Sequence, residues 1–182
     1  MYDISGCEAA LSDAHNCLAL FKAWQIWRGA ETIPSARMVR PEMLGRSLAG
    51  MAVIECHAPD KLVYRLVGEL YGEIFGRELK GQNLLDFTVE AERVERIRRT
   101  DSIISTPCGS IGIVNVLSER GLRNEIRTLL LPVWPTEEGQ PLRIYCAISN
   151  LGTAAEPTEI ERPPVPLAQS FHYVDIGFGV PD

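Results

Sequence analysis

The second half of the chain contains three apolar stretches separated by short, turn-rich connections, and these constrain the fold most strongly. They cover residues 111–117, 122–133 and 142–149. In the last of them apolar and polar residues alternate, as in a strand with one buried face. Parallel neighbours would need a crossover of a dozen or more residues, and the connections are too short for one. The three stretches therefore predict an antiparallel meander.

The preceding residues predict two more strands and a set of helices. A hairpin is expected over 51–56 and 62–67, where apolar runs flank a turn with proline and aspartate. Residues 69–88 favour short helical pieces punctuated by glycine, and a longer helix is expected over about 89–104. The order of elements is thus two strands, short helices, one long helix and three strands, which indicates an α+β fold.

An N-terminal amphipathic helix is expected to begin at a capping box formed by Ser5 and Glu8. Its apolar stripe includes Phe21, Trp24 and Trp27, which recur at helical spacing. Such a large apolar area either packs on its own domain or completes a second copy of the chain. The second alternative predicts a homodimer with Phe21, Trp24 and Trp27 at its interface.

Composition and charge exclude several classes of function. The 182 residues include 18 Lys and Arg against 24 Asp and Glu, a formal net charge of −6, which disfavours binding to a nucleic acid or to an anionic membrane. No stretch approaches the ~20 apolar residues of a membrane-spanning helix, and the N-terminus lacks the regions of a secretion signal. The five cysteines show no close pairing typical of disulfide frameworks or zinc sites. We expect a cytoplasmic protein with no metal site.

Motifs for catalysis are weak. The segment around Ser110 approaches a nucleophile-elbow pattern, but no helix is expected after it. The three histidines lie in different segments of the chain. The arginines of residues 93–99 alternate with glutamates and lack interleaved aromatic residues, which indicates a solvated helix face and not a nucleic-acid surface. We therefore expect no catalytic residues and no enzymatic activity.

Three motifs resemble those of a bacterial subfamily of PAS domains. They read Tyr64-Arg65-Leu66-Val67-Gly68, Phe75-Gly76-Arg77-Glu78-Leu79-Lys80-Gly81 and Leu131-Pro132-Val133. The resemblance covers about residues 18–152, and the chain departs from it at Glu69 and Lys80, where the subfamily has threonine. It implies a PAS-like five-stranded antiparallel sheet with helices on one face, preceded by the N-terminal amphipathic helix.

The resemblance also implies an organisation and a function. Residues 1–50 would form the N-terminal helix and a connecting turn, 51–152 the PAS-like core, and 153–182 a proline-rich linker with a β-like tail. A sensory or regulatory module is implied, one that binds a small ligand or a protein partner. No effector domain fits in the remaining residues, so we expect signalling in trans to a separate effector protein. The alternatives are a small α+β enzyme that uses the same cavity and a ligand-free interaction scaffold.

A PAS-like cavity would be lined by amphipathic aromatic residues and one arginine, because ligand pockets combine apolar walls with a few polar anchors. The candidate ligand-binding residues are Tyr64, Arg65, Tyr71, Phe75, Phe87, Trp134 and Tyr145. Tyr64 and Arg65 point to opposite faces of their strand, so at most one of them enters the cavity. A buried guanidinium there would need a carboxylate from the protein or from a ligand. The sequence identifies neither the ligand nor a cofactor.

Overall fold

One sheet of seven strands forms the centre of the computed structural model, which describes residues 2–118, 122–155 and 164–181. The strand order is β1-β7-β4-β5-β6-β2-β3, and every pairing is antiparallel except that of β1 with β7. The strands are β1 (Tyr2–Asp3), β2 (Met51–Ala58), β3 (Lys61–Val67), β4 (Gly109–Leu117), β5 (Leu122–Val133), β6 (Leu142–Ala155) and β7 (Ser170–Asp175). The predicted hairpin and meander are both present, as β2-β3 and β4-β5-β6.

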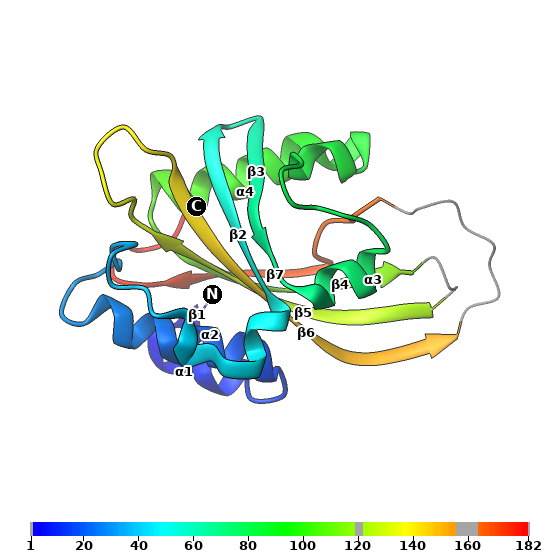
Figure 1. Cartoon of the computed structure of the whole chain (residues 1–182), viewed down its shortest axis with the longest axis horizontal. Helices are drawn as coiled ribbons and strands as arrows, with labels where there is room; N and C mark the ends of the chain where they lie inside the picture. Colours follow the sequence, from blue (N-terminus) through cyan, green and yellow to red (C-terminus); the bar gives the residue numbers. More distant parts are fainter. Residues whose placement is uncertain (1, 119–121, 156–163, 182) are drawn as a thin grey trace.

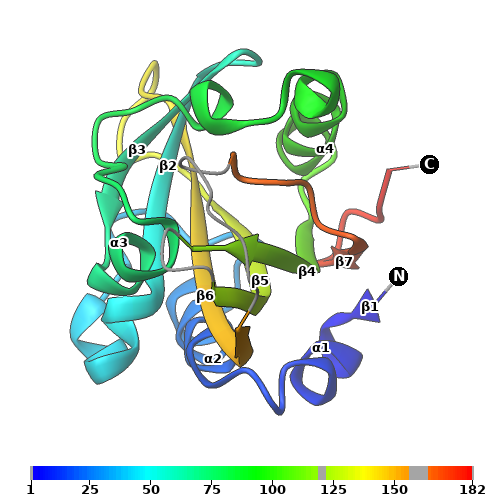
Figure 2. The same ribbon diagram turned by 90° about the vertical axis from the view of Figure 1, so that its right-hand side faces the viewer.

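Helices cover both faces of this sheet (Figures 1 and 2). Those of the N-terminal region, α1 (Ile4–Ala10), α2 (His15–Arg28) and the 3-10 segment η1 (Pro41–Gly50), precede the first long strand. The others are α3 (Glu69–Phe75), η2 (Leu84–Phe87), η3 (Glu90–Glu92) and α4 (Arg93–Ser105). In Figure 2, α1 and α2 lie below the sheet, and α4 lies above it. No helix within these described ranges is long and apolar enough to cross a membrane.

The expected five strands with helices on one face are thus corrected to seven strands with helices on both faces. The physical reason lies in the central strands, which are apolar on both sides. In β2, Met51 and Val53 pack in the core with α1 and α2, whereas Ala52 and Ile54 pack in the core with α3 and α4. A sheet that is apolar on both faces must be covered on both.

The N-terminal helix is interrupted, contrary to the prediction. Asp3, and not Ser5, caps α1: its carboxylate oxygen Oδ1 accepts from the Gly6 amide at 2.7 Å and from the Ser5 hydroxyl at 2.9 Å. The helix ends at Ala10, and α2 starts at His15. The amide hydrogen bonds lower the pKa of the exposed Asp3 carboxyl, which keeps it ionised at the positive end of the helix.

The aromatic stripe of α2 packs on its own sheet. Phe21 and Trp24 are fully buried and Trp27 is 2% exposed within a single chain. The indole Nε1 of Trp24 donates to the carbonyl oxygen of Pro132 at 2.9 Å, which fixes α2 to β5. In this structure Phe21, Trp24 and Trp27 pack within their own chain, as the first of the two alternatives expects, and the dimer interface at these residues stays a prediction.

The β-like tail joins the sheet. Strand β7 pairs with β4 in a register that sets His172 opposite Ile111, and β1 pairs with the outer edge of β7. Strand β6 continues to Ala155, beyond the expected end of the core at residue 152. Residues 156–163 of the predicted linker lie outside the described residues. The segment 164–169, which we call the strap, passes beside α4 before β7 begins (Figure 2).

Candidate functional site

A cavity of about 120 Å³ lies between the sheet, α3, α4 and the strap. This volume is close to that of protein cavities that hold a single aromatic ring. Most of its wall is apolar, and the apolar side chains come mainly from β2, β4, β5, β6 and α3. The polar groups of the wall lie chiefly on α4, namely Arg96, Arg99 and Thr100. The arrangement combines an apolar chamber with a few polar anchors, as small-molecule sites do.

Three of the seven candidate ligand-binding residues line this cavity: Tyr64, Tyr71 and Phe75. Tyr64 and Tyr71 are buried and meet edge to face, with ring centroids 6.4 Å apart. Phe75 follows one helical turn after Tyr71, at a centroid distance of 5.9 Å. Alternation along β3 aims Tyr64 inward, and the i, i+4 spacing puts the other two on the inner face of α3. Ligand contact at these three residues stays a prediction.

The structure places two of the other candidates, Arg65 and Phe87, outside the cavity wall. Arg65 points to the outer face of β3, where its guanidinium donates to Glu55 at 2.8 Å with half of its side chain exposed. The ring of Phe87 packs under the guanidinium of Arg77, 5.1 Å from the ring centroid. Arg65 therefore fails as the cavity's cation, because Tyr64 occupies the inward position of the strand.

Trp134 and Tyr145 also lie away from the cavity. Trp134 is 40% exposed beyond the end of β5. Tyr145 alternates with Cys146, which lines the cavity, and so points to the opposite face, where it meets Trp27 edge to face at 6.0 Å. There Tyr145 lines a second pocket of about 180 Å³, whose described wall carries no charged side chain.

The cavity's cations come from the arginine run of α4, which sequence reasoning interpreted as a solvated helix face. The Nη2 group of Arg96 donates to the carbonyl oxygens of Val165 and Pro166, both at 2.8 Å. Arg99 donates from Nη1 to the carbonyl oxygen of Ala168 at 3.2 Å, and its guanidinium lies 4.4 Å from the centroid of the Phe171 ring. The interpretation of this run as a solvated helix face is therefore wrong for Arg96 and Arg99.

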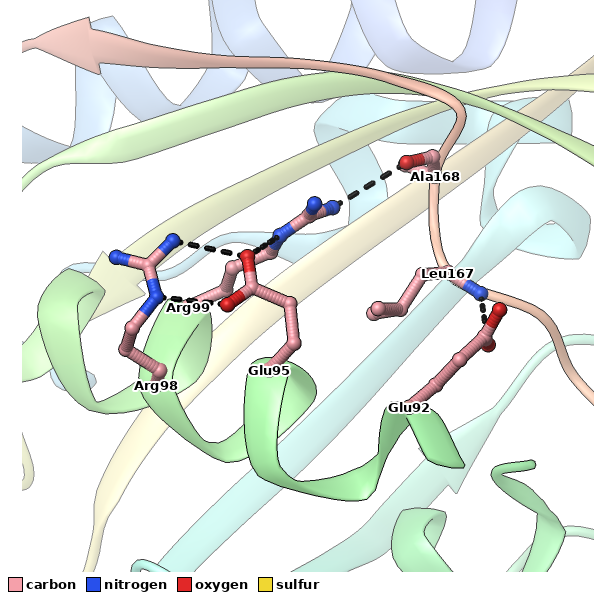
Figure 3. A network of polar contacts seen from close by, with 6 residues as sticks. All are labelled: Glu92, Glu95, Arg98, Arg99, Leu167 and Ala168. Atoms are coloured by element: carbon pink, nitrogen blue, oxygen red, sulfur yellow. Dashed lines mark hydrogen bonds and ion pairs between the residues drawn. The ribbon is translucent and has the colours of Figure 1, made fainter. Parts of the chain in front are cut away.

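Two glutamates, Glu92 at the end of η3 and Glu95 in α4, complete the attachment of the strap. Glu92 accepts from the backbone amide of Leu167 at 2.8 Å, and Glu95 holds Arg99 by an ion pair of 2.7 Å (Figure 3). Glu92, Arg96 and Arg99 follow the i, i+4, i+7 spacing of one helix face. This spacing was the only signal in the sequence that the three side chains share a face. It does not identify their partner, because the strap lies 69 to 75 residues further along the chain.

The polar groups of the cavity are incompletely paired. Among the described residues no carboxylate lies within ion-pair distance of Arg96, and its Nε is buried without a hydrogen-bond partner. Burial lowers the pKa of this guanidinium and raises the pKa of the Tyr64 and Tyr71 hydroxyls. The two phenols are therefore neutral donors at physiological pH.

The thiols lie in environments that suppress reactivity. All five cysteines are free, and burial raises the pKa of Cys7, Cys17, Cys56 and Cys108 to about 12. The pKa of Cys146, in the cavity wall, is raised by burial as well. Thiols of this kind stay protonated at neutral pH and act as small apolar side chains. Over the described part of the chain, no group of three or more His, Cys, Asp and Glu is placed to hold a metal ion.

Replacing Glu95 with glutamine is expected to lower the free energy of unfolding at pH 7 by less than about 1 kcal/mol, because the site is partly exposed. Hydrogen bonds from Arg98 and Arg99 lower the pKa of this carboxyl from 4.5 to about 2. The ionised form therefore stabilises the fold above pH 4.5, and this contribution is lost as the pH falls towards 2. Urea unfolding of both proteins from pH 7 down to pH 2.5 measures the difference, and a difference that stays constant over this range contradicts the assignment.

A family model described as PAS domain matches residues 12–149, a span that begins just before α2 and ends within β6. No curated protein matches the chain. The matched span contains the five-stranded antiparallel part of the sheet and both helices that border the cavity. Because the match covers well over half of the chain, the protein belongs to the PAS domain family.

Proposed function

We propose that the protein is a sensory or regulatory PAS module that binds a small ligand in the cavity between the sheet, α3, α4 and the strap. The cavity itself is the observation that carries the proposal, since it offers a ring-sized, mostly apolar chamber with polar groups at one side. Membership of the PAS family supports a sensory or regulatory role.

A route for the signal is suggested by the strap. It borders the cavity through Val165 to Ala168 and continues into β7, which lies between β4 and β1. A ligand shifts an equilibrium only through contacts that differ between two states. Contacts with the strap would differ if it moved, so we propose that occupancy of the cavity is transmitted to this edge of the sheet. A separate effector protein would then recognise the change.

A cavity-filling variant tests the ligand site. Val114 lines the cavity and is 8% exposed, so Val114→Phe should fill part of the chamber. Val94→Phe makes the same substitution on α4 at a position that is 79% exposed, and it serves as the matched control. Native mass spectrometry of protein purified from its own host is expected to show a retained small molecule in the parent and the control, but not in Val114→Phe.

Two results of this experiment would contradict the proposal. A parent protein that retains no molecule would favour the interaction scaffold, with the cavity as a packing gap. A molecule retained equally by Val114→Phe and the parent would place the binding site elsewhere, for example in the pocket beside Tyr145.

We propose no catalysis for this site. General acid–base chemistry needs groups whose pKa lies near the working pH. The titratable groups described in the wall are Tyr64, Tyr71, Arg96, Arg99 and Cys146, and burial moves the pKa of the two tyrosines and the cysteine further above neutral.

The homodimer and the cytoplasmic location stay predictions. Sedimentation of the purified protein would test the first, and fractionation of host cells would test the second.

A further inference from the structure

The cavity holds one cation that makes no ion pair with any carboxylate of the described residues. Arg96 lines the wall, and its hydrogen bonds go from Nη2 to the neutral carbonyl oxygens of Val165 and Pro166. Burial lowers the pKa of Arg96, whereas the Glu92 carboxylate raises it through its charge but forms no ion pair with the guanidinium. The Nε of Arg96 is buried and makes no hydrogen bond within the described part of the chain. By contrast Arg99, the second guanidinium of the wall, is paired with Glu95 at 2.7 Å. A largely buried guanidinium without a direct ion pair beside an apolar chamber is costly unless an anion arrives to pair with it.

Two further donors face the same chamber. Tyr64 and Tyr71 are buried and line the cavity, and neither hydroxyl makes a hydrogen bond with another described residue. Tyr64 and Arg96 are near enough that each influences the pKa of the other. A neutral phenol donates its proton, and a guanidinium has donors only. The polar part of the cavity is therefore rich in donors and calls for an acceptor.

We propose that the ligand is a small monocarboxylate with an apolar, ring-sized body, whose carboxylate accepts hydrogen bonds from Arg96 and Tyr64. The inference rests on the proposed function, because it names the chemistry of the molecule in that same cavity. The one guanidinium of the described wall without an ion pair matches a single negative charge, and a dianion would leave a buried charge unpaired. The cavity of about 120 Å³ and its apolar wall match one ring or a short branched chain.

A pair of isosteric probes tests this chemistry in the full chain. Benzoate and benzamide have nearly the same size and shape, but only benzoate is an anion. Isothermal titration calorimetry is expected to show that the parent binds benzoate roughly tenfold to hundredfold more tightly than benzamide, the range that a hydrogen bond to a charged group supports. Equal binding of the two probes, or no binding of benzoate, would overturn the inference.

Variants assign the preference to named groups. Arg96→Gln keeps a donor for the strap but removes the charge, and it should abolish the preference for benzoate. Tyr64→Phe removes one hydroxyl and should reduce the affinity for benzoate more than that for benzamide. Arg98→Gln alters an arginine of the same helix that is half exposed and outside the described wall, so it should keep the preference. A preference that survives in both Arg96→Gln and Tyr64→Phe contradicts the proposed carboxylate site.

The retained molecule separates this inference from the proposed function. If native mass spectrometry shows a retained molecule, its release and fragmentation should reveal one carboxylate. A retained neutral molecule would overturn the monocarboxylate and leave the proposed function intact. If nothing is retained and neither probe binds, both proposals are wrong.

Discussion

Replacing Trp24 with alanine is expected to lower the free energy of unfolding by about 3–5 kcal/mol, the range for removal of a large aromatic side chain from a core. Trp24 is fully buried between α2 and the sheet, and its indole Nε1 is bonded to the carbonyl oxygen of Pro132. The substitution removes both the apolar contacts and this hydrogen bond. Because α2 supplies most of the buried aromatic side chains on this face of the sheet, its attachment bears on the stability of the entire domain.

Urea unfolding followed by circular dichroism measures this loss, and Trp134→Ala provides the control. Trp134 is 40% exposed, so its removal is expected to change the free energy of unfolding by less than about 1 kcal/mol. The experiment also distinguishes the two roles of the α2 stripe. If Trp24 lay in a dimer interface, its removal would shift the sedimentation of the protein while the stability of each folded subunit changed little.

The strands were predictable because their evidence is local. Alternation and short connections act within about ten residues, which is the range over which a sequence pattern can be interpreted alone. The same alternation could have excluded Tyr145, since Ile144 and Cys146 on either side of it belong to the core on the cavity face. The inward position of Tyr64 and the outward position of Arg65 follow from the same rule.

The cation of the cavity could not be predicted in this way. Burial of Arg96 and Arg99 depends on the strap, and the strap contacts α4 from about 70 residues further along the chain. Without that partner, an arginine-rich and glutamate-rich helix is indistinguishable from a solvated one. The need for a carboxylate was conditional on Arg65 pointing inward, and Arg65 instead lies half exposed and pairs with Glu55. Similarly, nothing local in the tail indicated that β7 would extend the sheet beside β4.

Gly68→Ala is expected to lower the free energy of unfolding by about 3 kcal/mol, at the upper end of the cost of overpacking a core. Its backbone dihedrals, φ −77° and ψ 158°, are open to any residue, so conformational freedom does not explain the glycine. The reason is space: a Cβ atom here would overlap the backbone carbonyl groups of Leu48 and Ala49 in η1. Backbone atoms cannot rotate aside as side chains do, so η1 or the start of α3 would have to move.

Gly72→Ala adds the same methyl group four residues later and is expected to have the opposite effect. Gly72 lies inside α3, where an added Cβ meets no atom within 4 Å, so alanine should raise the free energy of unfolding by roughly 0.5–1 kcal/mol. Chemical denaturation of the two variants isolates the close approach from the general cost of replacing a glycine. Equal behaviour of the pair would mean that β3 and η1 do not meet as described. The expected divergence would show that the glycine of the Tyr64–Gly68 motif holds the entry to α3, and with it Tyr71, against the cavity.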